Sequence, residues 1–185
     1  MAQTATTADR NDEKKLLIHH PILETIDMTM ADMLLHEHET IIHIRRVQTL
    51  MGDIQTRLRK RAIDHDKSKL DHPELQVFST HTIMPEFGSE AYEKAHEELK
   101  IALQHHYEHN SHHPEHHEHG IEDMTLLDLV ELLCDWRAST ERSPHGCIKR
   151  SIDVGQERFR IGPQLSKILN NTIKELGWSC GCSEL

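Results

Sequence analysis

The strongest constraint on the fold is the helical spacing of apolar residues in the first third of the chain. These residues recur at i, i+3, i+4 and i+7, and they are Val47, Leu50, Met51, Ile54 and Leu58. Most arginines and lysines of the same stretch lie off this stripe. The pattern predicts an amphipathic helix over residues 37–62, closed by the segment 63–72, with its apolar stripe turned toward a core.

Helical signals also fill much of the remaining chain. Ser89 is a typical N-cap for a helix over residues 90–109, and Thr125 opens the strongly apolar stretch MTLLDLVELLCDWRA. Further helices are expected over residues 22–35 and 162–176. The stretches between these helices are expected to be a His-rich loop after residue 109 and a polar connection over residues 141–156. We see no strand alternation, repeat or interdomain linker, so the sequence predicts a single all-α domain.

Composition favours the same architecture. Of the 185 residues, 36% are hydrophobic and only 4% are aromatic, and glycine and proline are sparse, as in helical proteins. We expect a polar N-terminal arm over residues 1–20, one helical domain over 21–178 and a short tail over 179–185. The chain has no apolar run of about 18 residues and no secretory signal, and its CGC tail is typical of a reduced protein. A cytoplasmic location is therefore expected.

The charge of the chain limits its partners. The formal net charge is −10 with 18 histidines counted as neutral, whereas binding of duplex nucleic acid needs a basic surface. A small phosphorylated substrate remains compatible with this charge, because a divalent metal can supply the positive charge. The Met-rich segment 26–34 could pack against a partner, so a homo-oligomer stays open.

The adjacent pair His65-Asp66 is the first candidate for chemistry. His65 extends the helical stripe that reaches Ala62, so it is expected to point toward the core. A buried imidazole and carboxylate need an ion or each other, because an unpaired buried charge is costly. His43 precedes Val47 by four residues and shares the same stripe, although a core histidine bonded to the backbone explains it as well.

Three carboxylates share one face of the apolar helix. Asp128, Glu131 and Asp135 are spaced i, i+3 and i+7. A solvated outer face would explain Asp128 equally well, whereas Asp135 lies between Cys134 and Trp136 and is the better candidate for a ligand. The opposite face is expected to be the buried one and consists of Leu126, Leu129, Val130 and Leu133.

The order of these residues resembles the HD-domain superfamily of metal-dependent phosphohydrolases. The signature of that superfamily is an upstream histidine, a His-Asp pair that ends a helix, and a distant aspartate on a later helix. HDKSK at 65–69 looks like its HD-x-x-K form, and LVELLCDW at 129–136 resembles the later helix; the likeness spans about residues 37–140. Several longer strings resemble an uncharacterised group of short phage and bacterial proteins, namely HDKSK with PEL, HHYEHNSHHPEH, LLDLVELLCDW and RF…QL…NT.

The resemblance implies one helical HD-like domain with a metal site between its helices. That site would hold one or two divalent ions of Mn, Fe, Co, Ni or Zn. Its first ligands would be His43, His65, Asp66 and Asp135. His106, on the stripe of the helix over 90–109, and the pair His112 and His113 would complete a second ion site.

The remaining roles follow from the same resemblance. Asp66 would bridge two ions or accept a proton from water, and Lys69 would contact the substrate phosphate. Asp128 and Glu131 would lie behind the ligands, and the other histidines of the His-rich run would form the rim of the site. Weaker candidates for phosphate contacts are Arg142, Lys149 and Arg158.

The leading interpretation is therefore a metal-dependent phosphohydrolase, a nucleotide phosphatase or phosphodiesterase. It would hydrolyse a phosphoester of a nucleotide or a related small molecule, with a His/Asp-bound metal that activates water. Two alternatives stay open, because a fold does not fix a function. One is a protein that binds or senses metal without catalysis, and the other is a diiron oxygenase of the same fold.

Overall fold

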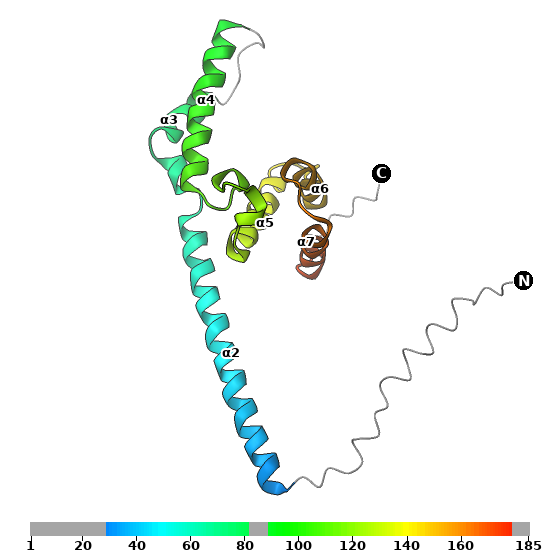
Figure 1. Cartoon of the computed structure of the whole chain (residues 1–185). Helices are drawn as coiled ribbons and strands as arrows, with labels where there is room; N and C mark the ends of the chain where they lie inside the picture. Colours follow the sequence, from blue (N-terminus) through cyan, green and yellow to red (C-terminus); the bar gives the residue numbers. More distant parts are fainter. Residues whose placement is uncertain (1–28, 82–88, 179–185) are drawn as a thin grey trace, which may run out of the picture. The chain divides into compact units, whose positions relative to one another are not determined.

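The structure is a computed structural model that describes residues 29–81 and 89–178 (Figure 1). The predicted arm over 1–20 and tail over 179–185 lie outside the described residues. The chain divides into two units, with the boundary between Gly52 and Asp53. Helices and connecting turns make up all of the described chain, with no strand in it, so the all-α prediction is confirmed.

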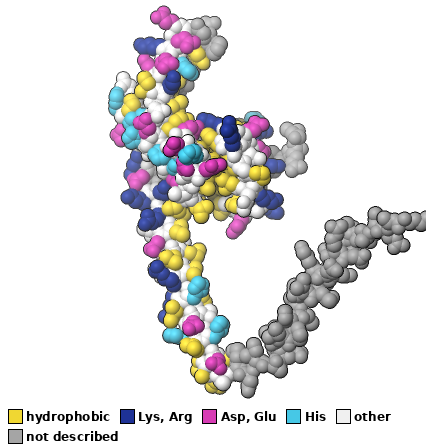
Figure 2. Space-filling model, in the orientation of Figure 1, with side chains coloured by type: hydrophobic (Ala, Val, Ile, Leu, Met, Phe, Trp, Pro, Cys, Tyr) yellow, Lys and Arg dark blue, Asp and Glu magenta, His cyan; other side chains and the backbone are white. Residues whose placement is uncertain are grey.

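The first described helix, α2, runs from Met30 to Asp64 without a break. The prediction of two helices, over 22–35 and 37–62, is therefore wrong in its described part. The expected inward position of the apolar stripe is also wrong, because α2 contains no buried residue. Hydrophobic side chains are exposed along its length, as the space-filling view shows in yellow (Figure 2). A helical period identifies an apolar face but does not say what covers that face.

The second unit contains the remaining elements in short succession. Two of its helices begin where the sequence predicts: the Ser89 hydroxyl accepts a hydrogen bond from the Tyr92 amide, and Thr125 and Asp128 form a capping box. After α2, the described elements of this unit are the 3₁₀ turns η3 (Lys67–Leu70), η4 (Pro114–His116) and η5 (Gly120–Asp123), and the α-helices α3 (Glu74–Thr80), α4 (Glu90–His109), α5 (Leu126–Thr140), α6 (Ile148–Phe159) and α7 (Pro163–Glu175).

The hydrophobic core of this unit lies between α5, α6 and α7. The prediction of a polar connection over 141–156 is wrong, because α6 occupies much of it and buries Ile148 and Ile152 completely. Four-residue spacing places these two isoleucines on one helical face, while the charged residues around them lie outside. The buried core residues are Leu133, Ile148, Ile152, Ile161, Leu169 and Ile173. None of the described helices is sufficiently long and apolar to cross a membrane.

Gly155 of α6 provides a test of this packing. A Cβ atom at Gly155 would lie 2.3 Å from Cη2 of Trp136, whereas a Cβ atom at Gly52 of α2 would meet nothing within 4 Å. Alanine favours a helix by up to about 1 kcal/mol over glycine, but overpacking costs about 1–3 kcal/mol. We expect Gly155→Ala to lower the free energy of unfolding and Gly52→Ala to raise it. Urea denaturation of the two variants measures both, and a stabilised Gly155→Ala protein would contradict the packing.

Candidate metal centre

The centre starts at the C-terminal end of α2, where the chain turns sharply. Asp66 adopts a left-handed conformation, with φ 56° and ψ 15°, and caps η3. Side chains of adjacent residues diverge in a regular helix, but this turn brings the pair together, with Nε2 of His65 3.5 Å from Oδ2 of Asp66. The Lys69 ammonium lies one turn further and donates to the same oxygen at 2.6 Å.

Three histidines from the end of α4 and the following turn approach Asp66 from another side. Nε2 of His106 and Nε2 of His112 lie 3.4 and 3.6 Å from Oδ1 of Asp66. His113 joins them, with its Nε2 2.9 Å from Nε2 of His106. His106 and His112 are almost completely buried. The imidazole nitrogens that face Asp66 are therefore all Nε2 atoms.

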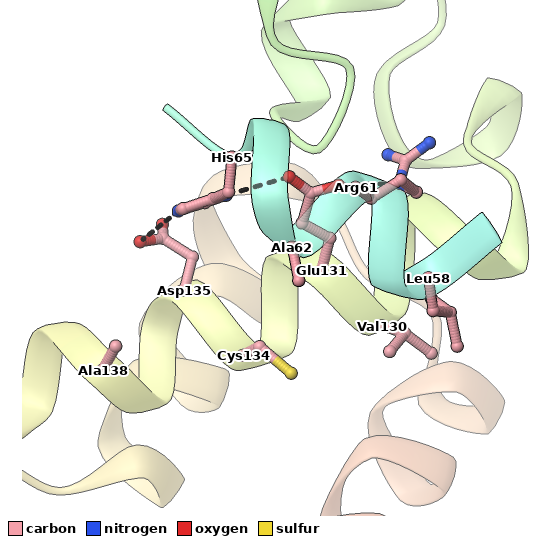
Figure 3. A pocket seen from close by; sticks show the side chains of 9 residues that line it. All are labelled: Leu58, Arg61, Ala62, His65, Val130, Glu131, Cys134, Asp135 and Ala138. Carbon is pink, nitrogen blue, oxygen red and sulfur yellow. Dashed lines mark hydrogen bonds and ion pairs between the residues drawn. The ribbon is translucent and has the colours of Figure 1, made fainter. Parts of the chain in front are cut away.

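The carboxylates of α5 face His65 and His112. Oε1 of Glu131 lies 2.9 Å from Nδ1 of His65, and Oδ1 of Asp135 lies 3.8 Å from Nε2 of His65 (Figure 3). The same Oε1 of Glu131 lies 3.2 Å from Nδ1 of His112. Asp128 is buried, so the alternative that it lies on a solvated outer face is wrong. The expectation of an apolar buried face is wrong in part, because Leu126 is exposed and Val130 is 44% exposed.

Arg61 links the carboxylates behind the histidines. Its Nε donates to Oε2 of Glu131 at 2.7 Å, and its Nη2 donates to Asp128 and, at 3.0 Å, to Ser111. Sequence reasoning missed this arginine, although its position three residues after Leu58 on the same stripe was an available signal. The guanidinium fixes Glu131, and Glu131 in turn orients two imidazoles.

Glu74 also orients two imidazoles, as Glu131 does. It begins α3, which contacts α4, and its side chain is fully buried. Its two oxygens lie 2.8 Å from Nδ1 of His105 and 2.8 Å from Nδ1 of His106. Nothing in the local sequence distinguishes this glutamate from a surface residue at a helix start, where glutamate is common.

The donor set fits a metal ion. Glutamates occupy Nδ1 of His65, His106 and His112, an arrangement that orients the Nε2 atoms of metal-binding histidines. Oδ1 of Asp66 and Nε2 of His112 are buried and have no hydrogen-bond partner within the described chain. Buried polar atoms rarely stay unpaired. A cation near Asp66 would satisfy both atoms.

Potential ligands form three overlapping groups in the described chain. Asp66 belongs to the first, with His106, His112 and His113, and to another, with His65 and Asp135. The remaining group contains His65, His112 and Glu131, but Glu131 already binds both Nδ1 atoms there and serves better as an orienting residue. Nitrogen and carboxylate donors together suit divalent transition metals.

The charge state of the histidines suits this use. Burial, and then the neighbouring His112 and His106, lower the pKa of His113 to about 4, and burial and Lys69 lower the pKa of His106. Both imidazoles are therefore neutral near pH 7 and keep the lone pair that a metal needs. Asp135 and Glu131 raise the pKa of His65 to about 10, so a metal at His65 must displace a proton.

Asp128 should make the free energy of unfolding depend on pH. Burial works to raise the pKa of Asp128, but hydrogen bonds from Thr125, Ser111 and Arg61 lower it to about 2. A lowered pKa stabilises the fold above the ordinary value of 3.8, and this stabilisation is lost as the pH falls toward about 2. We expect Asp128→Asn to cost about 2 kcal/mol at neutral pH, with the difference from wild type shrinking between about pH 4 and pH 2.

Urea denaturation at several pH values measures this difference. Asp153 is an exposed aspartate of α6, and Asp153→Asn is the matched control, whose difference from wild type should stay small throughout. If the unfolding free energies of Asp128→Asn and wild type differ by the same amount at every pH, the lowered pKa of Asp128 is contradicted.

Other predicted site residues lie elsewhere. His43 is exposed in the first unit and belongs to none of the ligand groups, because the stripe that suggested an inward position is exposed. Arg158 pairs with Glu115 at 2.7 Å, Arg142 follows the end of α5, and Lys149 lies in α6. The structure does not bring these three to Asp66, whose ion pairs within the described chain are with His65, Lys69, His106 and His112.

The remaining histidines of the His-rich run have other contacts. His105 contacts Glu74, and His119 contacts Asp123. His109, His116 and His117 contact backbone carbonyl oxygens. None of these five belongs to a ligand group among the described residues.

A protein-family model matches most of the chain. No curated protein and no solved structure matches the chain. The family model of DUF5662, which is described as a family of unknown function, matches residues 33–175 and thus includes every residue of the centre. The chain is therefore a member of the DUF5662 family.

Proposed function

We propose that the protein is a metal-dependent phosphohydrolase that cleaves a phosphoester of a nucleotide or a related small molecule in the cytoplasm. The observation that carries the proposal is the half-buried Asp66 carboxylate, whose buried Oδ1 faces Nε2 of His106 and of His112 and lacks a hydrogen bond within the described chain. The order of His65, Asp66, Lys69 and Asp135 along the sequence, which resembles the HD superfamily, supports the same conclusion.

Asp66 and Lys69 would carry most of the chemistry. Burial opposes ionisation of Asp66, but the hydrogen bond and charge of Lys69 lower its pKa, so the carboxylate is ionised at neutral pH. Lys69 is 40% exposed at its side chain and can also reach a phosphate oxygen. A bound divalent metal would make water more acidic and offset the negative charge of the phosphate. Glu131 and Glu74 would hold the imidazoles in place while the ester bond breaks.

Hydrolysis of phosphoesters tests the proposal. The purified protein is loaded in turn with Mn²⁺, Fe²⁺, Co²⁺, Ni²⁺ or Zn²⁺. Phosphate release is measured with nucleoside monophosphates and simple phosphomonoesters, and the products of nucleoside triphosphates and cyclic nucleotides, which need not include phosphate, are separated by chromatography. We expect at least one metal to support hydrolysis, and Asp66→Asn to reduce it by about 10²–10³-fold, because several kcal/mol of transition-state stabilisation would be lost.

His116→Ala is the matched control, because His116 belongs to the same His-rich run but contacts a backbone carbonyl oxygen and the His117 ring, and it belongs to none of the ligand groups of the described chain. Its activity should equal that of wild type. Tight metal binding without hydrolysis of any substrate would refute the proposal and leave a metal-binding protein. Iron-dependent oxygen consumption without hydrolysis would instead indicate an oxygenase.

A further inference from the structure

A pocket of about 330 Å³ opens beside the metal centre, between the C-terminal part of α2 and α5 (Figure 3). One end of the pocket carries His65 and Asp135, which are candidate metal ligands. Most of the remaining wall is apolar and consists of Leu58, Ala62, Val130, Cys134 and Ala138. The pocket therefore borders the centre, because His65 and Asp135 belong to both.

The polar groups of the pocket wall already have partners. Arg61 donates to Glu131 and Asp128, and Glu131 also contacts His65. The backbone amides of the two wall helices bond within those helices. Away from His65 and Asp135, a ligand in this pocket therefore meets mainly carbon and sulfur, and a hydrogen-bonding edge that it buries there loses water without replacement.

We propose that this pocket holds the apolar, ring-sized group of the substrate, while the phosphoryl group lies at Asp66 and Lys69. The inference rests on the proposed function and narrows its substrate class to phosphoesters with a flat, weakly polar substituent. A volume of about 330 Å³ is at the lower end of the range for small-molecule sites, so it suits one or two rings rather than a long chain.

The position of the pocket indicates that the substrate itself occupies it. Any group that enters it comes within reach of His65 and Asp135, so the group and a phosphate at the centre can belong to one molecule. A pocket without unpaired polar groups selects by shape and apolarity. If the substrate is a nucleotide, the centre should therefore discriminate little among the nucleobases and strongly against phosphoesters of small polar alcohols.

Protection of Cys134 tests binding without requiring turnover. Cys134 is an exposed free cysteine in the pocket wall, and its alkylation by a maleimide can be followed by peptide mass spectrometry. With the metal-loaded protein, we expect 1-naphthylmethylphosphonate at ten times its Kd to slow this alkylation about 10-fold. Methylphosphonate carries the same charged group without the rings and should give little protection.

Val130→Asp tests the apolar wall directly. It should weaken binding of the naphthyl phosphonate by at least about 10-fold, because a carboxylate would line the site of the rings. Val154→Asp on α6 is the matched control, since Val154 is also exposed but lies outside this pocket. Its binding should equal that of wild type.

The outcomes separate this inference from the proposed function. Equal protection by both phosphonates, or protection by neither in a protein that hydrolyses phosphoesters, overturns the inference alone. Protection by the naphthyl phosphonate in a protein that hydrolyses none of the substrates keeps the pocket as a binding site and refutes the phosphohydrolase. Protection of Cys134 that rises with protein concentration in the absence of ligand would show that a second copy of the chain fills the pocket, and would overturn the inference.

Discussion

Asp66→Asn should abolish the thermal stabilisation that a divalent metal gives to the wild-type protein. At a free metal concentration of 100 times the Kd, the wild type should gain about 2.7 kcal/mol, which is about 5–10 °C in Tm for a chain of this size. The variant should gain almost nothing, because Asp66 belongs to two of the three ligand groups and an amide lacks the charge of the carboxylate.

The same substitution should leave the metal-free protein folded. Asparagine tolerates the left-handed conformation of Asp66 at least as well as aspartate does, so the turn into η3 should persist. Differential scanning fluorimetry with and without metal measures both effects, and elemental analysis of the dialysed protein counts the ions. A variant that keeps the metal-dependent shift would exclude Asp66 as a ligand.

Arg61→Met should destabilise the protein and weaken the centre together. Removing the guanidinium leaves the buried Asp128 and the half-buried Glu131 without their cation, and breaking such a pair costs about 3–5 kcal/mol when it is fully buried. Because the Arg61 side chain is 25% exposed, we expect about 2–3 kcal/mol, or about 5–10 °C in Tm. The release of Glu131 should also lower metal affinity by about 10–100-fold.

Two further variants identify the cause of these losses. Arg57→Met changes an exposed arginine one turn earlier on α2 and should alter stability by less than about 0.5 kcal/mol. In a double-mutant cycle, Asp128→Asn should cost less in the Arg61→Met background than in wild type, because the pair is already broken. Additive effects of the two substitutions would contradict the coupling that the hydrogen bonds imply.

Local signals predicted the helices of the second unit better than they predicted what covers each helix. Ser89 and Thr125 mark helix starts correctly because a hydroxyl that caps an amide acts within four residues. The exposed stripe of α2 and the inward acidic face of α5 depend instead on partners far along the chain. Helix α6 was missed because its buried Ile148 and Ile152 are embedded among charged residues.

Some residues of the candidate centre could be predicted from the sequence, and others could not. His65 and His106 could be selected from the sequence by residue type and helical phase. Asp66 could be selected as the neighbour of His65, and Asp135 by its place within an apolar helix. The supporting residues Arg61 and Glu74 could not, since their roles arise from contacts across 70 and 32 residues. His43 shows the reverse error, because a favourable phase on an amphipathic helix suggested burial where the side chain is exposed.

The short turn that joins His106 to His112 and His113 also affects how the centre can assemble. These three candidate ligands lie within eight consecutive residues, and His65 and Asp66 are neighbours, so most of the donor set sits in two short stretches. Closing a loop of a few residues costs little chain entropy. The donors of each stretch can therefore be brought together around a cation at little cost in chain entropy, whereas joining the two stretches requires the tertiary structure.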